Sequence, residues 1–561
     1  MIAVLHKFFA AVPLVAIALS LALGYWFGKI RIGTFVLGPV AATLLVSIAI
    51  GQVGVSVSGD VKTLCFALFI YALGYMIGPQ FVGSLGHATL KQLHLTIVST
   101  LVVIFTVWGL AKGFNLDKGT AAGILAGGAT ESAVIGTASD ALASQPLPKD
   151  EIARQTANIG VTYAITYLFG TFTVIFFASS LAPKLLGIDL ASASREYERE
   201  LGGGMEKLPS GQFGAFRKFD ARIHEISPAS SGRTVQDLES EMQGAVIESI
   251  VRGSESIRAT PAESLQAGDR VAVIGRRTDV QRVETFLGPE TSDLSGFQSI
   301  VEMREVVVTN RKLAGRTIGD IVETGNAEVR RGAFLRSLTR LGQPLPIAPN
   351  TTLAIGDVAE VIGAPPDVER VSKIIGEATP PQDKTDFLYF SLGLAAGFSL
   401  GLVGVPFAGT LLGLGTGGGC LIAGLIFGWL RAKRPTFGHL PAAAALYLKD
   451  FGLTVFVACI GLSTGPEALQ QIFKHGVALV VAGIAVSLVP GLVALYYGKY
   501  VLKLHPVILS GAICGRQAST PALNAVTLAA GSNAPVLGYT VPYTVANVLL
   551  TLAGPIVVLI T

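Results

Sequence analysis

The chain has 561 residues, of which 51% are hydrophobic and only 14% are charged, with a formal net charge of +4. About a quarter of the residues of a typical soluble protein are charged, so this composition excludes a disordered chain and argues against an ordinary soluble enzyme. It also offers no basic surface for nucleic acid. The charges are unevenly placed, because 53 of the 80 charged residues lie between Leu185 and Thr385. Two very apolar flanks therefore enclose an insert of ordinary polarity.

The flanks contain uncharged runs of the length that an α-helix needs to cross a bilayer, about 20 residues. These runs cover residues 8–28, 32–59, 63–90 and 155–183, and then 387–430, 476–498 and 517–561. We interpret the first run as a membrane helix, because it is longer than the apolar region of a signal peptide. The four cysteines lie in apolar segments without ligand spacing, which predicts buried side chains and neither a disulfide nor a metal site.

The two flanks resemble each other, which indicates an internal repeat. Gly74–Pro79 matches Gly461–Pro466, and Gly123–Ser132 matches Gly511–Thr520, with offsets of 387 and 388. Further pairs are Lys62 with Lys449, Gly24 with Gly397, Gly28 with Gly401, and Val161–Tyr163 with Val541–Tyr543.

Each repeat offers about six apolar segments, and the fifth is unusual. It covers about 119–142 or 507–530, is rich in Gly, Ser and Thr, and carries Glu131 or Arg516. Non-helical backbone at membrane depth is tolerated only inside protein or beside water, so we expect a re-entrant or broken hairpin. Five crossings then remain in each half. The predicted fold class is a polytopic α-helical membrane protein, with two inverted repeats of about five crossings plus a re-entrant hairpin each and an α/β cytoplasmic insert between them.

The insert is predicted to form two tandem α/β domains. Arg233–Asp237 is echoed by Arg316–Asp320, and Gly268–Gly275 by Gly356–Gly363. Each echo ends in a β-branched run that predicts a strand followed by a helix. The expected boundaries are 1–184 for the first membrane repeat, 185–211 for a linker, 212–290 and 300–378 for the two domains, and 386–561 for the second membrane repeat.

The tandem domains resemble the C-terminal regulatory domains of potassium-uptake proteins. This likeness implies ligand sensing or dimerisation. A structural dimer scaffold without a ligand is an equal alternative, because no set of residues in the insert identifies an effector.

Arg516 is the only charged residue between His505 and the C-terminus. An ionisable group inside a membrane is a functional hypothesis by default, and a guanidinium suits a carboxylate ligand. The alternative is a structural ion pair with Glu131 or Asp450. Glu131 lies in the matching loop, where it could bind a substrate ammonium or a proton, cap a half-helix, or pair with Arg516.

Neutral side chains near these two charges complete the candidate site. The hydroxyls of Thr130, Ser132, Ser519 and Thr520 could donate to the oxygens of a carboxylate, and the competing interpretation is that these small residues serve helix packing. Three further residues either line the cavity or belong to the core: Tyr163, Tyr543 and Asn547. The predicted substrate-binding residues are Gly128, Ala129, Thr130, Glu131, Ser132, Arg516, Gln517, Ser519, Thr520, Tyr543 and Asn547.

Gly413–Gly418 matches the dinucleotide pattern GxGxxG, but it lies in a charge-free run without an acidic residue about 20 positions later. These glycines instead predict an unwound helix or close helix packing. The chain shows no catalytic constellation and no metal-ligand spacing, so we expect neither an enzyme nor a cofactor.

The strings Leu412–Gly419, Gly127–Ser132 and Gly515–Pro521, together with the two membrane halves and their insert, resemble the aspartate:alanine exchanger family of bacterial inner-membrane transporters. The resemblance implies an electrogenic antiporter that imports aspartate, exports alanine and is coupled to a cytoplasmic aspartate decarboxylase. It places the protein in the inner membrane with the central domains in the cytoplasm, an orientation that the Lys and Arg distribution favours modestly. An elevator-like motion of the hairpins against a homodimer scaffold is our mechanistic hypothesis.

Two other functions stay open at this stage. One is export or exchange of another dicarboxylate, such as succinate, and either stereoisomer of aspartate fits the sequence. The other is a cation channel or symporter gated by the central domains, although the Thr-Val-Gly-Tyr-Gly filter of potassium channels is absent. The expected partners are therefore small amino-acid or dicarboxylate substrates and the lipid bilayer, and not nucleic acid.

Overall fold

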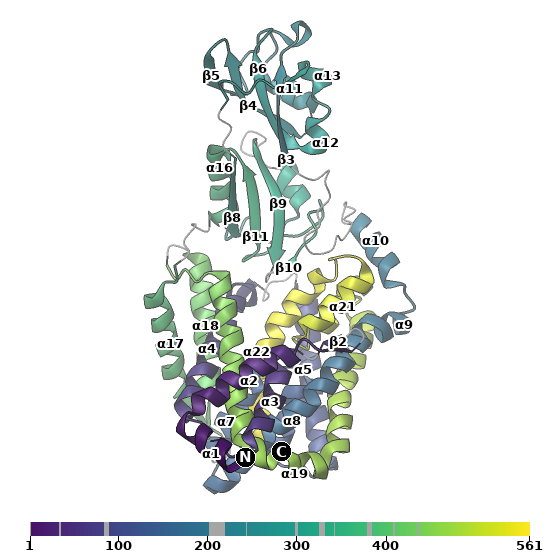
Figure 1. The fold of residues 1–561 in the computed structure, drawn as a ribbon. Helices are drawn as coiled ribbons and strands as arrows, with labels where there is room; N and C mark the ends of the chain where they lie inside the picture. Colours follow the sequence, from purple (N-terminus) through teal and green to yellow (C-terminus); the bar gives the residue numbers. More distant parts are fainter. Residues whose placement is uncertain are drawn as a thin grey trace. The chain divides into compact units, whose positions relative to one another are not determined.

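In the computed structural model the chain divides into two compact units (Figure 1). Residues 1–199 and 381–561 form the first, which we name the membrane unit, and residues 200–380 form the second, the central unit. The structure describes residues 2–32, 35–36, 38–55, 57–83, 89–200, 219–242, 244–297, 301–324, 331–340, 343–378, 384–407, 410–434 and 437–561.

The membrane unit is helical except for two small β-hairpins. Its first half contains α1 (Ile2–Ala11), α2 (Pro13–Phe27), β1 (Arg31–Ile32), β2 (Phe35–Val36), α3 (Pro39–Gly51), α4 (Gly59–Gly83), α5 (Leu90–Gly113), α6 (Lys118–Gly128), α7 (Ala133–Ala143), α8 (Lys149–Phe176), a π-helical turn η2 (Phe177–Leu181), α9 (Ala182–Leu186) and α10 (Leu190–Glu200). Its second half contains α17 (Phe387–Gly401), β13 (Gly404–Phe407), β14 (Thr410–Gly413), α18 (Gly415–Lys433), α19 (Ala442–Tyr496), η5 (Tyr497–Val501), α20 (Pro506–Gly515), α21 (Thr520–Ala530) and α22 (Val536–Ile560).

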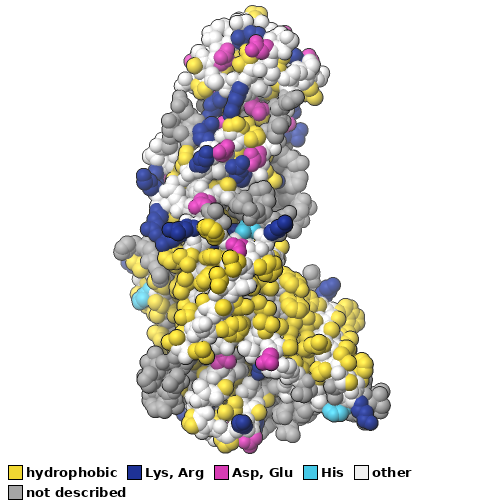
Figure 2. All heavy atoms as spheres, turned by 90° about the vertical axis from the view of Figure 1, so that its left-hand side faces the viewer, with side chains coloured by type: hydrophobic (Ala, Val, Ile, Leu, Met, Phe, Trp, Pro, Cys, Tyr) yellow, Lys and Arg dark blue, Asp and Glu magenta, His cyan; other side chains and the backbone are white. Residues whose placement is uncertain are grey.

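Six helical stretches among the described residues are long and apolar enough to cross a bilayer, three in each half. They are Gly59–Val82, Leu90–Gly113, Lys149–Leu186, Ala442–Gly465, Gly476–Val501 and Val536–Ile560. Figure 2 shows hydrophobic side chains gathered over one side of the membrane unit. Phe387 and Leu388 on α17 are 72% and 74% exposed, which water would disfavour and lipid would not. The protein is a polytopic α-helical membrane protein.

Glycines allow the same backbone contacts in both repeats. A Cβ at Gly127 in α6 would collide with the backbone of α8 at Tyr163 and Tyr167, and a Cβ at Gly515 in α20 with that of α22 at Tyr539 and Tyr543. The glycines are 388 positions apart, as the sequence predicts, but their partners are 376 apart. Tyr163 therefore corresponds to Tyr539, and its predicted pairing with Tyr543 is wrong by one helical turn.

The cause of this shift is the length of α8. Helix α8 has about 12 residues, or three turns, before the part that corresponds to the start of α22. The triplet Val541–Tyr543 of α22, which matches Val161–Tyr163 in sequence, lies one turn after the residues that are structurally equivalent to Val161–Tyr163.

The first helices of each repeat also correspond. Gly24 of α2 packs against Thr43 of α3, and Gly397 of α17 packs in the same way against Cys420 of α18. The loop between each helix pair holds a β-hairpin, β1–β2 or β13–β14. The sequence match of Gly24 with Gly397 thus reflects an equivalent helix contact.

The GxGxxG segment ends β14 and begins α18. Gly415 adopts φ +64°, and a Cβ at Gly417 would press on the Phe66 ring and on Thr137. The stretch is a close-packed helix start, as its position in an apolar run predicts.

The central unit contains two five-stranded antiparallel sheets with equivalent strand orders, β5-β4-β6-β3-β7 and β10-β9-β11-β8-β12. The first domain is built from β3 (Phe219–Glu225), α11 (Val235–Met242), β4 (Ala245–Arg252), β5 (Glu255–Arg258), β6 (Arg270–Arg276), α12 (Arg277–Val280), α13 (Glu284–Leu287) and β7 (Glu290–Thr291). The second is built from β8 (Glu302–Val308), α14 (Ile318–Thr324), β9 (Ala333–Arg340), β10 (Gln343–Pro344), β11 (Val358–Gly363), α16 (Pro365–Ile375) and β12 (Gly376–Ala378).

A buried ion pair recurs in the two domains. Arg252 Nη2 lies 2.7 Å from Asp269 Oδ2, and Arg340 Nη2 donates to Asp357 Oδ2 at 2.7 Å. Both carboxylates are buried and also accept a backbone N–H, so they tie the turn before β6 or β11 to the neighbouring strand. The tandem duplication thus extends to single ion pairs.

At the start of α11, hydrogen bonds from the Thr234 hydroxyl and backbone lower the pKa of Asp237.

Of the expected linker, residues 190–200 belong to α10. Residues 201–218, which hold the last part of that linker and the expected start of the first domain, lie outside the described residues.

Gly511 tests the backbone packing of the hairpins. A Cβ there would collide with the carbonyl oxygen of Pro535, so Gly511→Ala should lower the free energy of unfolding by about 1–3 kcal/mol. The purified variant should therefore melt at a lower temperature in detergent. Gly109→Ala is the matched control, because that glycine on α5 has open space around it and alanine favours a helix. Equal melting temperatures for the two variants would contradict the packing described.

Candidate functional site

The fifth apolar segment of each repeat is a broken helix. Helix α6 stops at Gly128 and α7 begins at Ala133, while α20 stops at Gly515 and α21 begins at Thr520. Thr130 and Ala518, which occupy equivalent positions in the two breaks, have φ of +55° and +50°. Residues other than glycine rarely adopt this left-handed conformation. The break is therefore built into the backbone of both repeats, as the sequence predicts for the two hairpins.

The tips of the two hairpins contact each other directly. The Thr130 hydroxyl donates to the carbonyl oxygen of Gln517 at 2.6 Å. In return the Gln517 amide nitrogen donates to the carbonyl oxygen of Gly128 at 2.7 Å. The two loops that the sequence singles out in separate halves are thus one site in the folded chain.

Ser487, on α19, joins the hairpin tips to their surroundings. Its hydroxyl lies 2.6 Å from Gln517 Nε2 and donates to the carbonyl oxygens of Gly128 and Gly170, at 2.8 and 3.1 Å. One hydroxyl therefore connects α6, α8, α19 and the loop after α20. No sequence signal marks this serine, because it is a small polar residue in a long apolar helix.

Arg516 is 2% exposed and only partly satisfied. Its Nη2 donates to the Ser487 carbonyl oxygen at 3.0 Å and to Gln517 Oε1 at 3.1 Å. Its Nε and Nη1 are buried and have no hydrogen-bond partner among the described residues. Because buried donors are normally paired, these N–H groups mark a place for an acceptor.

Glu131 presents the complementary group. It is 3% exposed, its Oε1 accepts the Ala133 backbone N–H at 3.4 Å, and its Oε2 has no partner among the described residues. Glu131 thus caps the start of α7 with one oxygen and offers the other.

The ion pair considered as the alternative role of Arg516 is not formed. Within the described part of the chain, Arg516 contacts neither Glu131 nor Asp450 in an ion pair, and Asp450 pairs instead with Lys449 at 3.4 Å. The two buried charges of the hairpins therefore remain separate.

Two hydroxyl–tyrosine pairs flank the tips. Ser132 Oγ lies 2.7 Å from the Tyr163 hydroxyl, and Thr520 Oγ1 lies 3.1 Å from the Tyr539 hydroxyl. These pairs are equivalent in the two repeats. Tyr539 is absent from the predicted residues because the sequence match assigns its role to Tyr543, one turn later on α22.

The remaining predicted residues have local roles. Ser519 caps α21 by accepting the Ala522 N–H at 3.4 Å, and Ala129 is a buried residue at the end of α6. Asn547 donates to the Tyr543 carbonyl oxygen at 2.7 Å, one turn back on its own helix. The structure thus brings the residues of the two loops together, while the Asn547 amide bonds within α22.

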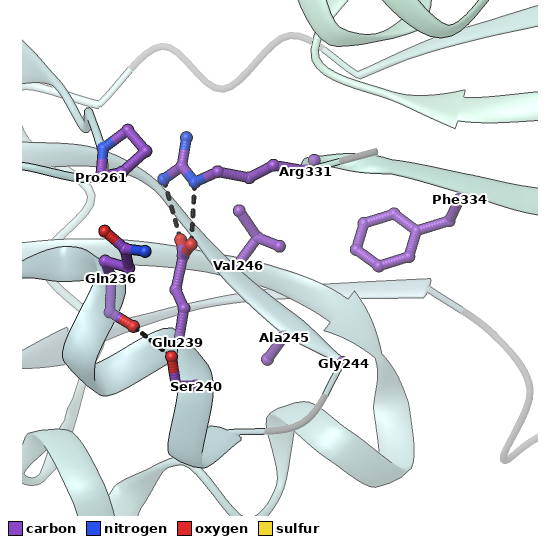
Figure 3. Close-up of a pocket in the computed structure, with 10 residues that line it drawn as sticks. Gln236, Glu239, Ser240, Gly244, Ala245, Val246, Pro261, Arg331 and Phe334 are labelled. Carbon is purple, nitrogen blue, oxygen red and sulfur yellow. Dashed lines mark hydrogen bonds and ion pairs between the residues drawn. The ribbon is translucent and has the colours of Figure 1, made fainter. Parts of the chain in front are cut away.

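The central unit holds a separate cavity of about 430 Å³ between its two domains. Figure 3 shows Arg331 reaching Glu239 across it, with Val246 and Phe334 beside them. Arg331 donates to both Glu239 oxygens at 2.8 Å, to the Ile247 carbonyl at 2.8 Å and to the Ala259 carbonyl at 3.1 Å. Four of the five N–H groups of this guanidinium are therefore used in joining the domains.

The membrane unit matches a known family of transporters. The aspartate:alanine exchanger family model, described as "Predicted Permease Membrane Region", matches residues 16–183 and 389–559. The chain belongs to this family. Relatives include an uncharacterized transporter of Bradyrhizobium diazoefficiens, 39% identical over 98% of each chain, and one of Zymomonas mobilis, 36% identical over 97% of each chain. A third, from Francisella tularensis, is 35% identical over 97% of this chain and 96% of its own.

The exchanger family assignment covers both membrane halves, and the TrkA-C domain model matches residues 221–288 within the central unit. The second domain has the strand order of the first. This member of the family is therefore a multi-pass membrane transporter with regulatory-type central domains, in accord with the relatives that are named transporters.

Ser487 tests the contact between the hairpin tips. Ser487→Ala removes the hydroxyl that accepts from Gln517 Nε2 and shares its hydrogen between the Gly128 and Gly170 carbonyl oxygens, so we expect a loss of about 1–3 kcal/mol of stability. Ser399→Ala is the control, because the hydroxyl of that exposed serine donates to the Ala395 carbonyl oxygen, one turn back on its own helix. The melting temperatures of the two variants in detergent give the comparison, and an unchanged value for Ser487→Ala would show that the tips do not depend on this hydroxyl.

Proposed function

We propose that the protein exchanges aspartate for alanine across the bacterial inner membrane, with the central domains in the cytoplasm. The observation that carries this proposal is the pair of incompletely satisfied charges between the hairpin tips. Arg516 offers N–H donors and Glu131 offers a carboxylate oxygen, both buried. A buried donor set and a buried acceptor, one on each of two loops that contact each other, suit a molecule that carries both a carboxylate and an ammonium group.

Alanine and aspartate share those two groups. In this proposal the α-carboxylate binds Arg516 and the ammonium binds Glu131, while the Ser132 and Thr520 hydroxyls with their tyrosine partners receive the second carboxylate of aspartate. Glu131 favours an amino acid over a dicarboxylate such as succinate, because succinate has no ammonium and would place its negative charge near this carboxylate.

The charges of the substrates define the energetics. Aspartate carries a net charge of −1 and alanine carries none, so each exchange moves one negative charge inward. A cytoplasmic decarboxylase that converts aspartate and one proton into alanine and carbon dioxide would consume a proton for each cycle. Exchange and decarboxylation together would then sustain a proton-motive force.

Alternating access in this proposal is an elevator-like motion of the hairpins against a scaffold formed by a homodimer. Each hairpin packs by backbone contacts on the helix that follows it, which supports their movement as one body. The tip contacts formed by Gln517 and Ser487 hold the two hairpins together during this movement.

Exchange in reconstituted liposomes tests the function. Uptake of labelled aspartate should rise when alanine is present inside, because exchange requires a counter-substrate. Arg516→Ala should lower the apparent affinity for aspartate by roughly 10- to 100-fold, the effect of losing a hydrogen bond to a charged group. Arg199→Ala, on the exposed face of α10, is the control.

Two results would contradict the proposal. Internal succinate that stimulates aspartate uptake while internal alanine does not would replace the substrate pair. Folded Arg516→Ala with wild-type affinity would remove Arg516 from the binding site.

A further inference from the structure

The membrane unit contains a second polar cavity, away from the hairpin tips. Its volume is about 410 Å³, within the range of sites that bind small molecules. The charged residues on its wall are Lys62 and Asp140, and hydroxyl side chains accompany them: Thr63, Ser139, Thr156, Thr416, Ser463 and Thr464. It contains neither Arg516 nor Glu131, so the site described above does not account for it.

The cavity lies where α4 and α8 begin and α7 ends. Lys62 stands in the first turn of α4, Asp140 near the last turn of α7, and Thr156 in the part of α8 that has no counterpart in α22. Helix α7 runs from the hairpin tip to this cavity, a distance of about 10 Å along its axis between Ala133 and Asp140. The extra turns of α8 thus help to form one wall of this cavity.

The two charged groups in the cavity differ in how they are held. Asp140 Oδ2 accepts the Gly417 backbone N–H at 3.3 Å at the start of α18, and the absence of a side chain at Gly415 lets the carboxylate approach. The Lys62 amine, on the cavity wall, forms no hydrogen bond or ion pair with any residue that the structure describes. One wall therefore carries a positioned anion and the other a cation available to a ligand.

We propose that this cavity is an access site for zwitterionic α-amino acids, in which Lys62 binds the carboxylate and Asp140 the ammonium. The inference rests on the proposed function, since it assumes that the transported substrates are amino acids. The stacked rings of Phe66 and Phe456, 4.6 Å apart, give an apolar surface for the methyl group of alanine or the methylene group of aspartate.

The second repeat lacks this arrangement. Lys449, the counterpart of Lys62, is paired with Asp450, and the counterpart of Asp140 is Leu528, which is 76% exposed. A charge pair required only for the fold of a repeat would be expected in both. Its presence in one repeat, inside a cavity, points to a ligand.

Kinetics of the intact transporter in liposomes give the first test. Lys62→Met should raise the apparent KM for aspartate about tenfold, whereas Lys449→Met should leave it unchanged. Asp140→Asn keeps an acceptor for the start of α18, because asparagine also caps helices. It should raise the KM for both aspartate and alanine, since both present an ammonium.

Cysteine protection gives a readout that does not depend on transport. The native cysteines are buried, so a polar maleimide should label Lys62→Cys selectively. Aspartate and alanine should each slow this labelling several-fold, and succinate, which lacks the ammonium, should not. Lys449→Cys should be labelled at one rate with or without these compounds.

The outcomes separate the two proposals. Wild-type exchange of aspartate for alanine, combined with unchanged KM values in Lys62→Met and Asp140→Asn and no protection of Lys62→Cys, would overturn the access site and leave the function standing. Protection of Lys62→Cys by amino acids in a protein that does not exchange aspartate for alanine would support the access site and overturn the substrate pair. Equal protection at Lys449→Cys would show a general conformational change and would overturn the access site.

Discussion

Gln517 and Ser487 satisfy a backbone group that helix α6 leaves open. The last carbonyl groups of a helix have no partner within it, and no water reaches them in a bilayer. The Gly128 carbonyl oxygen receives both the Gln517 amide and the Ser487 hydroxyl, at 2.7 and 2.8 Å. Breaking a helix at membrane depth therefore obliges the opposite hairpin and α19 to supply donors. The contact between the two repeats meets this need, and it brings Arg516, the sequence neighbour of Gln517, to the first hairpin.

The same constraint bears on exchange. A closed centre with unpaired groups on Arg516 and Glu131 is unfavourable, because buried ionic groups without partners cost several kcal/mol. In the proposed function, a bound amino acid supplies both missing partners. The substrate-bound centre would close more readily than the empty one, which is what a strict exchanger requires.

Much of this organisation can be predicted from the sequence, because it depends on charge and glycine spacing. The apolar flanks, the repeat and the broken helices follow from long uncharged runs and from glycines that recur at a fixed offset. The tandem central domains follow from repeated strings such as Gly268–Gly275.

Other features depend on side-chain contacts that no pattern records. Ser487 is one serine in an apolar helix, and its role comes from where α19 passes the two tips. The sequence does not predict the role of Tyr539. Helix α8 is longer by about three turns, which changes the offset between equivalent residues of α8 and α22, and a chance sequence match pairs Tyr163 with Tyr543 instead. The separation of Arg516 from Glu131 depends on how the two loops fold, which their sequences do not specify.

The unequal pair Asp140 and Leu528 has a consequence for the direction of transport. When a transporter is built from two repeats, each repeat contributes to the opening on one side of the membrane. In the proposed function, the carboxylate of Asp140 would lie at one opening and the exposed Leu528 at the other, which would make the two openings chemically different. In the proposed mechanism the exchanger is therefore sided: it captures amino acids more tightly from one compartment than from the other, and this difference belongs to the protein rather than to the gradients across it.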